Sequence, residues 1–385
     1  MKLFVKLAVI VLFAALFSVL YMESIPERIE SQTDQYFDFD CGNYVSIIKS
    51  PWRLMHEQKI KRHPLTALLY RPIYAVAGRM DATGAVTTAA GLIIFGIWAI
   101  RMRRSLFMIL GAITFIGLSM SIWWSAGVLE ARAAIFFGLA FFLLGLSVKS
   151  PILQGVYTLP LLFASPGYFW FLPIGAIAQI QRSVGLGSLK RAGIYIATAL
   201  VLLAAIYSVF LATGIKCGPV DTFLCHRHDT KKADFFTTKY FEWKYMCRSQ
   251  HGLASAFLIL PDDHWINPRR IALASTSLVC RYWRYWYGAV FMIIAAVCAV
   301  LTLPRAIMYR GKYLLPLVVW FFLSALFWLY LCPYQAAPFF VGLPLAVAAW
   351  MVVYSTDAIA VLLYLAAIMM AIGNYKVILS VCSIN

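Results

Sequence analysis

The hydrophobic positions of the chain gather into long runs that carry almost no charge. A helix that spans a bilayer needs about 20 mainly apolar residues. The runs approach that length, and they are solidly apolar where the strands of a membrane β-barrel would alternate. They cover residues 3–20, 84–100, 106–122, 133–148, 192–213, 286–303, 313–331, 337–353 and 357–373. The pattern therefore predicts an all-α, polytopic membrane protein.

Two further apolar segments, 152–164 and 168–180, are shorter and are interrupted by prolines. We expect them to form a tilted or partly re-entrant hairpin. With this pair the chain has about eleven transmembrane helices in a single integral-membrane domain, residues 1–385. The apolar stretch 65–80 is left out of the count, because it is short and Arg71-Pro72 interrupts it.

The two ends of the apolar pattern need separate interpretation. The first run follows Lys2 as in a signal peptide, but it lacks a small-x-small cleavage site. We interpret it as a retained first helix. The tail 374–385 is expected to lie outside the membrane or to return as a half-helix.

Two segments are too long and too polar to be membrane turns. We call residues 22–81 the first outer loop and residues 216–270 the second outer loop. Long loops are usually functional or disordered, and these are rich in aromatic residues. Within the first outer loop, apolar residues recur at nearly helical spacing on both sides of Ser50-Pro51. We expect two short amphipathic helices that lie in the membrane interface.

Composition narrows the class of protein further. Hydrophobic residues make up 62% of the chain and charged residues only 13%, against roughly a quarter charged in a soluble domain. A soluble globular enzyme, a disordered chain, a coiled coil and a disulfide mini-protein are excluded. The net charge of +17 does not indicate a nucleic-acid partner, because the 33 Lys and Arg residues lie between the apolar runs.

The charges of the short loops predict the orientation of the chain. With a cytoplasmic N-terminus, the inner loops hold ten basic residues and no acid, whereas the short outer turns hold one Arg and one Glu. The inner basic residues are Arg101, Arg103, Arg104, Lys149, Arg182, Lys190, Arg191, Arg305, Arg310 and Lys312. Because cytoplasmic loops are enriched in Lys and Arg, we expect both long loops to face outward. The short inner loops and the compact size indicate a bacterial inner membrane.

The acidic residues avoid the apolar runs. The first outer loop holds eight of the sixteen acids, and the second holds six. Proton or sodium coupling requires ionisable groups inside the membrane, so this placement counts against an ion-coupled transporter. It favours acid–base chemistry or polar recognition at the outer surface.

Two short motifs in the first outer loop carry a family resemblance. They are Asp38-Phe-Asp40-Cys-Gly-Asn-Tyr44 and Arg62-His63-Pro64-Leu65. With an apolar first helix before them, they make roughly the first hundred residues resemble the GT-C superfamily of integral-membrane glycosyltransferases. The resemblance implies inverting transfer of a sugar from a polyprenyl-phosphate donor on the outer face. The acceptor would be a glycan, a lipid or a protein hydroxyl.

The resemblance also implies that an aspartate of the first outer loop is the general base. A base must reach the acceptor hydroxyl and be ionised near neutral pH. Asp40 is the preferred candidate, because Tyr44 follows it at the spacing seen in the family. Asp38 is the second choice. The competing interpretation is that both acids belong to a solvated turn or a helix cap.

The leaving lipid phosphate needs cations that stabilise its charge. The candidates for phosphate or acceptor binding are Tyr44, Lys59, Lys61, Arg62, His63, Arg281 and Arg284. Arg281 and Arg284 are three apart and share a helical face, although the aromatic residues around them are typical of an interfacial belt. His63-Pro64 also fits a capped helix start, and the lysines fit attraction to anionic lipid.

The cysteines of the second outer loop raise the question of a metal site. Cys225-His-Arg-His228 lacks the ligand spacing of structural zinc sites. The paired Asp-Glu that some GT-C members carry after the first helix is also absent, so no metal or other cofactor is assigned. A disulfide that joins Cys217 to Cys225 or to Cys247 is favoured in an oxidising outer compartment.

Two other functions remain open. A polymerase or ligase of lipid-linked glycans would depend on basic residues of the second outer loop. A flippase would move lipid or glycan without chemistry. Membrane lipids are partners in every case.

Overall fold

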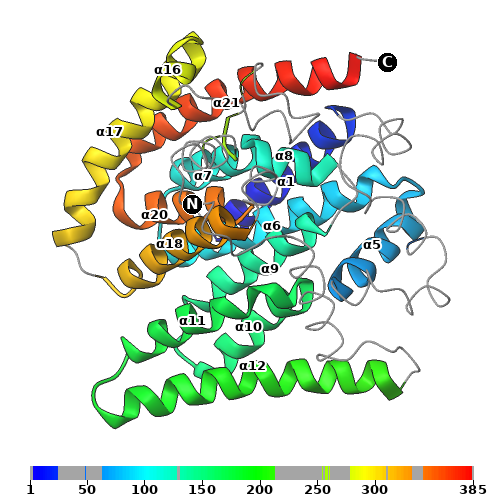
Figure 1. Cartoon of the computed structure of the whole chain (residues 1–385), viewed down its shortest axis with the longest axis vertical. Coiled ribbons are helices and arrows are strands. Elements are labelled where there is room, and N and C mark those ends of the chain that lie inside the picture. The colour runs from blue at the N-terminus through cyan, green and yellow to red at the C-terminus, as the bar shows by residue number, and fades with distance from the viewer. Residues whose placement is uncertain are drawn as a thin grey trace.

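The computed structural model describes residues 3–24, 48, 63–127, 131–212, 254, 256–258, 260, 278–308, 311–331 and 341–383. Within these ranges the chain is all-helical, without strands, as the hydrophobic pattern predicts (Figure 1). The helices are α1 (Leu3–Ser24), α5 (Pro64–Ala77), α6 (Asp81–Arg101), α7 (Leu106–Leu118), α8 (Met120–Gly127), α9 (Arg132–Gly145), α10 (Pro151–Ala164), the 3₁₀ turn η1 (Pro166–Trp170), α11 (Phe171–Ile180), α12 (Leu186–Ala212), α16 (Leu278–Trp283), α17 (Trp286–Met308), α18 (Leu314–Leu331), α20 (Gly342–Tyr354) and α21 (Asp357–Ser383).

Among the described helices, α1, α6, α12, α17 and α21 are long and apolar enough to cross a membrane, and α7 and α8 meet the same criterion only when taken together as one bent span. The shorter apolar helices, of 10–17 residues, are α9, α10, α11, α20 and the part of α18 from Leu314 to Ser324. The chain is therefore an integral membrane protein. Every apolar segment singled out in the sequence overlaps a helix, and the total of about eleven spans stays a prediction.

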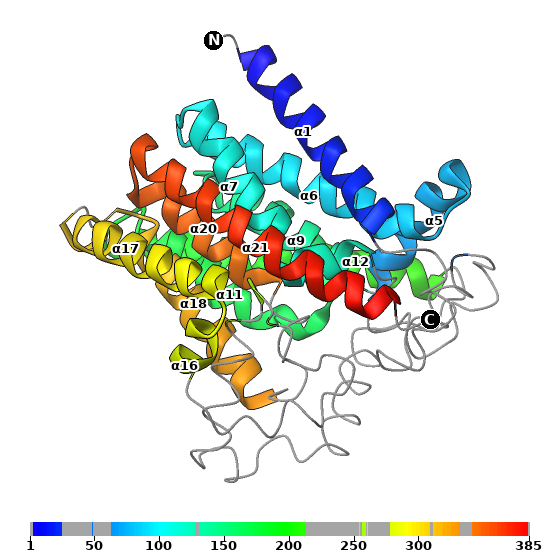
Figure 2. The same cartoon turned by 90° about the horizontal axis from the view of Figure 1, so that it is seen from above.

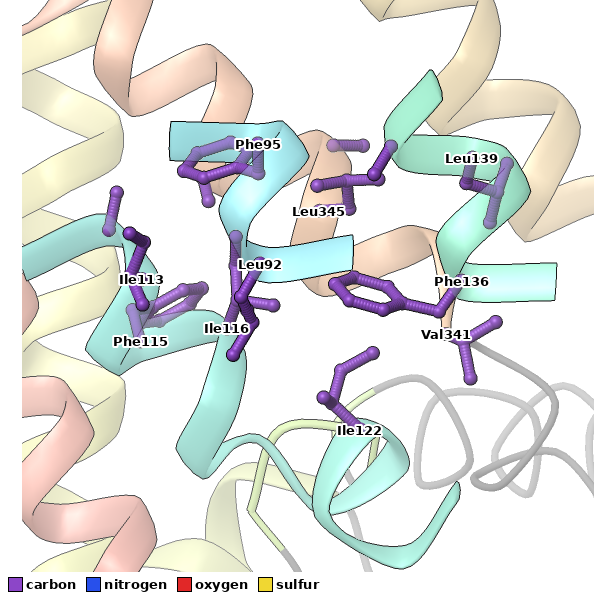
Figure 3. Close-up of a cluster of buried hydrophobic side chains, with 14 of the residues drawn as sticks. Leu92, Phe95, Ile113, Phe115, Ile116, Ile122, Phe136, Leu139, Val341 and Leu345 are labelled. Carbon is purple, nitrogen blue, oxygen red and sulfur yellow. The ribbon is translucent and has the colours of Figure 1, made fainter. Parts of the chain in front are cut away.

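The centre of the bundle is α6. About 72% of its apolar window is buried, whereas α1 is only 17% buried. Helices α1, α5, α7, α8 and α9 all contact α6. Figure 3 shows Leu92 and Phe95 of α6 between the side chains of α7, α8, α9 and α20, with Phe136 directed toward them.

The outward faces of the peripheral helices stay apolar. Large side chains remain exposed on α1, α12 and α17, among them Leu12, Val201 and Val300. Lipid tails are as apolar as these side chains, so their exposure carries no penalty in a membrane.

Glycine lets helix backbones approach closely at two points. A Cβ added at Gly84 of α6 would lie 2.5 Å from the Ala126 carbonyl oxygen of α8. One added at Gly138 of α9 would lie 2.6 Å from the Cα of Leu161 in α10. Helix packing in membranes depends on such small residues, because van der Waals contact drives the association.

The two ends of the bundle hold different residues. We call the end that holds Arg101, Lys149, Arg182 and Lys312 the basic end, and the opposite end, which holds the last residues of α1 and α10 and the first residues of α6, the loop end. Helix α1 begins on the left and α21 ends on the right in both Figure 1 and Figure 2. The first and last helices therefore point in the same general direction along the bundle.

Three helix boundaries differ from the expectations of the sequence analysis or decide between them. The apolar run 106–122 is broken at Ser119, where α7 and α8 meet at 66°. Residues 65–80 contain helix α5, which has Pro64 in its first turn and ends at Gly78 with φ +69°. Residues 374–383 continue α21 as one helix, so the prediction of a separate half-helix there is wrong.

Candidate functional site

Both ends of the segment 25–62 are attached to the loop end of the bundle. At the last residue of α1, the Ser24 hydroxyl accepts a hydrogen bond from the Trp123 Nε1 of α8 at 2.7 Å. At the start of α5, the His63 Nδ1 lies 3.0 Å from the carbonyl oxygen of Ala164, the last residue of α10. The segment that carries Asp38 and Asp40 therefore leaves and re-enters the bundle at the same end.

The contact of His63 assigns the tautomer of its ring. A carbonyl oxygen only accepts, so the proton of the neutral imidazole lies on Nδ1. His63 also precedes Pro64, which suits the first turn of α5. His63 occupies the N-cap position of α5, but its side chain makes no capping hydrogen bond and binds the Ala164 carbonyl instead.

A buried acid lies where α6 begins. Asp81 is almost fully buried, and its carboxylate accepts two hydrogen bonds from Arg79, at 2.6 and 3.1 Å. The Ala82 amide donates a third at 2.9 Å. A carboxylate at a helix N-terminus is favoured by the helix dipole. Because 47% of the Arg79 side chain is exposed, Asp81 holds a solvent-facing cation at the loop end.

Residues 256–258 of the second outer loop bind the backbone at the break between α7 and α8. The amides of Met120 and Ser121, at the start of α8, donate to the carbonyls of Phe257 and Ala256, each at 3.0 Å. A helix start leaves amides without partners, so a turn from more than a hundred residues away supplies the acceptors. We call residues 256–258 the inserted segment.

Asn374 joins the broken helix to the inserted segment. This fully buried side chain of α21 donates from Nδ2 to the Leu118 and Phe257 carbonyls, both at 2.8 Å. Around it, Leu258 is also fully buried, and its carbonyl accepts from the Tyr282 hydroxyl at 2.5 Å. The inserted segment is thereby fastened to α7, α8, α16 and α21.

Arg281 and Arg284 lie near this anchor but not on one regular helix. Arg281 belongs to α16, whereas Arg284 lies in the break before α17. The Arg284 amide donates to the Arg281 carbonyl at 3.2 Å, which keeps the two residues on one turn. The neighbouring indoles of Trp283 and Trp286 are each 59% exposed, a pattern typical of an interfacial aromatic belt.

The other sequence-predicted site residues lie outside the described residues. They are Asp38, Asp40, Tyr44, Lys59, Lys61, Arg62, Cys217, Cys225 and Cys247. In the part of the chain that the structure describes, no group of His, Cys, Asp and Glu could hold a metal ion. The acids of that part, Glu23, Asp81 and Asp357, all lie at helix ends.

At the basic end, arginine side chains bind helix carbonyls. Arg182, which follows α11, donates to the carbonyls of Leu146 and Val148 at the C-terminus of α9. Arg104 donates to two carbonyls at the C-terminus of α20, at 2.5 and 3.2 Å. The last carbonyls of a helix lack helical partners, and a cation there complements the helix dipole. These inner-loop charges are thus part of the packing.

Two buried glutamines extend this network. The Gln179 amide donates to Gln154 Oε1 at 2.5 Å, and the Gln154 amide donates to the Gly175 carbonyl at 3.0 Å. Arg191 of α12 donates to Gln179 Oε1 at 3.0 and 3.2 Å. The pair therefore joins α10, α11 and α12 at the basic end.

Burial and crowding of like charge shift the pKa of groups at the basic end. Burial lowers the pKa of Lys312, and the nearby charges of Arg182 and Lys149 lower it further. Burial raises the pKa of Tyr313 to about 12, against the opposing effect of Arg182 and Arg101. The Tyr313 hydroxyl is therefore protonated at neutral pH.

Sequence reasoning missed Asn374 and the inserted segment. Asn374 carried a weak signal, because it directly follows the apolar run 357–373 and a buried amide is costly unless it is hydrogen-bonded. The inserted segment carried none, since its sequence, Ala256-Phe-Leu258, looks like any apolar part of a loop. In comparisons with known proteins, no family model, curated protein or solved structure matches the chain.

Proposed function

We propose that the chain is an inverting glycosyltransferase that uses a polyprenyl-phosphate sugar as donor and works at its loop end. One observation carries the proposal: Ser24 and His63, which flank the segment with Asp38 and Asp40, bind at the end of the bundle opposite Arg104 and Arg182. Because basic loops face the cytoplasm, this arrangement supports an outer location for the two acids.

In the proposed reaction, the Asp40 carboxylate takes the proton of the acceptor hydroxyl. The acceptor oxygen forms a bond to the anomeric carbon as the bond from that carbon to the donor phosphate breaks. Polyprenyl phosphate leaves with the electron pair, and the configuration at the anomeric carbon inverts. Asp38 is the second candidate for the base.

The leaving phosphate needs fixed positive charge. Lys59, Lys61 and Arg62 are the candidates from the sequence, with Tyr44 and His63 beside them. Arg79 joins them, because the buried Asp81 orients its guanidinium with two hydrogen bonds. A cation held by a carboxylate is pre-organised for a phosphate oxygen.

The test is an assay of membranes with a labelled polyprenyl-phosphate sugar. Asp40→Asn is expected to lower turnover by about 10²–10⁴-fold, the usual contribution of a general base, while Asp38→Asn has a smaller effect. Asp357→Asn, an acid at the basic end, is the matched control and keeps full turnover. Full transferase activity in both Asp38→Asn and Asp40→Asn would contradict the proposal.

A polymerase or ligase of lipid-linked glycans is the second candidate. The observation in its favour is the inserted segment, which ties the second outer loop to the bundle beside Arg281. In that case Arg281→Ala with Arg284→Ala abolishes product formation and Asp40→Asn does not. The absence of any labelled product from all variants and from the wild type would instead favour a flippase.

A further inference from the structure

The basic end contains buried hydrogen-bond donors that have no acceptor in the described part of the chain. The hydroxyls of Tyr313 and Tyr354 and the Nε1 of Trp98 are each buried without a hydrogen-bond partner. The Trp98 and Tyr313 rings meet edge to face, with centroids 6.3 Å apart, and Tyr354 is near enough to Tyr313 to interact electrostatically. An unsatisfied buried polar group costs about 1–3 kcal/mol, so three together require an explanation.

Among the described residues, the charged groups that act on Lys312 and Tyr313 are all cationic. The Lys312 ammonium lies 5.1 Å from the centroid of the Tyr313 ring. Arg182 and Lys149 are close enough to Lys312 to act on its charge, and Arg101 acts in the same way on Tyr313. No salt bridge pairs these cations with an acid among the described residues.

The acid of this end does not neutralise the cluster. Asp357, at the start of α21, acts on Arg104, which already binds the carbonyls of α20. Arg182 is likewise committed to the carbonyls of α9. Lys312, Lys149 and Arg101 therefore have no counter-ion within the described part of the chain.

We propose that this cluster, which we call the donor cluster and define as Trp98, Lys312, Tyr313 and Tyr354, binds a phosphate group at the basic end. The indole and the ammonium only donate, and the phenol hydroxyls can donate. The group that completes such a set is an acceptor with several oxygens and negative charge, which describes a phosphate. The raised pKa of Tyr313 keeps its hydroxyl available as a donor.

The cluster suits a phosphate in the headgroup layer of the membrane. It lies where α6, α18 and α20 begin or end, on helices of an apolar bundle with exposed hydrophobic side chains. Anionic lipids attract basic segments near the membrane surface. A lipid headgroup and free phosphate share this chemistry, and the experiment separates them. The proposal does not depend on the glycosyltransferase function.

The experiment measures the melting temperature of the detergent-purified full chain at constant ionic strength. Three probes are titrated: phosphatidylglycerol in mixed micelles, phosphatidylcholine in the same micelles, and inorganic phosphate. The test variants are Lys312→Gln and Tyr313→Phe. The matched control is Lys190→Gln, an exposed lysine of the same end for which no side-chain contact is found.

Phosphatidylglycerol is expected to raise the melting temperature of the wild type and of Lys190→Gln equally. Both test variants are expected to need about tenfold more probe, the effect of losing one charge-assisted hydrogen bond. A response to inorganic phosphate at similar concentration identifies free phosphate as the ligand, and a response to phosphatidylglycerol alone identifies a headgroup.

Three results would overturn the proposal. One is an equal loss in Lys190→Gln and Lys312→Gln, because a bulk charge effect does not need the donor cluster. The second is no response of the wild type to any of the probes. The third concerns the unliganded protein. Tyr313→Phe is expected to melt at or above the wild-type temperature, since removal of an unpaired hydroxyl is neutral or stabilising, and a clear fall would show that the hydroxyl already has a partner within the protein.

Discussion

The two ends of the bundle satisfy their helix termini by different means. At the basic end, arginine side chains cap the helices: Arg182 and Arg104 donate hydrogen bonds to the last carbonyls of α9 and α20. At the loop end, backbone carbonyls of the inserted segment cap α8 by accepting hydrogen bonds from its first amides. Both kinds of cap join segments that are distant in sequence, since Arg104 binds Val353 and Ser355. Each side-chain cap depends on one long side chain, whereas the backbone cap depends on the whole loop that delivers it.

From this difference we expect Arg182→Gln to destabilise the protein more than any single change at the loop end. The substitution leaves the carbonyls of Leu146 and Val148 without their donor in a half-buried site. We expect a loss of about 3–5 kcal/mol in the free energy of unfolding, because each hydrogen bond from a charged donor contributes about 1.5–3 kcal/mol. Thermal unfolding in detergent measures it. Lys190→Gln, with an exposed side chain at the same end, is expected to change stability by less than about 0.5 kcal/mol; equal effects would mean that Arg182 acts only through net charge.

At the loop end, the corresponding change is Asn374→Leu. It removes both hydrogen bonds that Nδ2 donates and leaves two buried carbonyls under-satisfied, at an expected cost of about 2–3 kcal/mol. Hydrogen exchange should increase at Met120 and Ser121, while the helices of the basic end stay protected. Tyr375→Phe, on the exposed side of α21, serves as the control. Uniform loosening of the whole bundle would refute the idea of a separate backbone cap.

A smaller effect is expected for Asp81→Asn. The change weakens the ion pair with Arg79 and the bond from the Ala82 amide, at a cost of about 1 kcal/mol, because one partner is half exposed. If Arg79 contacts the donor phosphate, the donor KM rises while the melting temperature hardly moves. An unchanged KM would remove Arg79 from the proposed site.

The smallest effect concerns alkaline pH. The pKa of Tyr313 is raised by burial to about 12, above its ordinary value of about 10. The folded protein thus holds this proton more tightly than the unfolded chain, so its contribution to stability is complete below about pH 10 and falls as the pH rises toward about 12. Melting temperatures across this window should fall more steeply for the wild type than for Tyr313→Phe. Parallel curves would contradict burial of the hydroxyl.

The predictability of the two ends also differs. The apolar runs predicted the helices, and the short-loop charges predicted which residues gather at the basic end, because helix periodicity and charge bias are local properties of sequence. The break at Ser119 and its repair by Phe257 were not predictable. They depend on contacts between segments more than a hundred residues apart. The catalytic role of Asp38 and Asp40 stays a prediction. His63 lies at the loop end, which is the end that the glycosyltransferase hypothesis requires.

The inserted segment has a consequence for how the protein is made. The amides of Met120 and Ser121 find their acceptors in residues that the ribosome adds about 130 positions later. At about 5–20 residues per second, that delay is on the order of ten seconds. During the interval α8 enters the bilayer with an unsatisfied start, which hydrocarbon does not tolerate. The loop-end half of this helix pair must therefore wait in water or against an insertase, and a chain truncated before residue 256 cannot complete it.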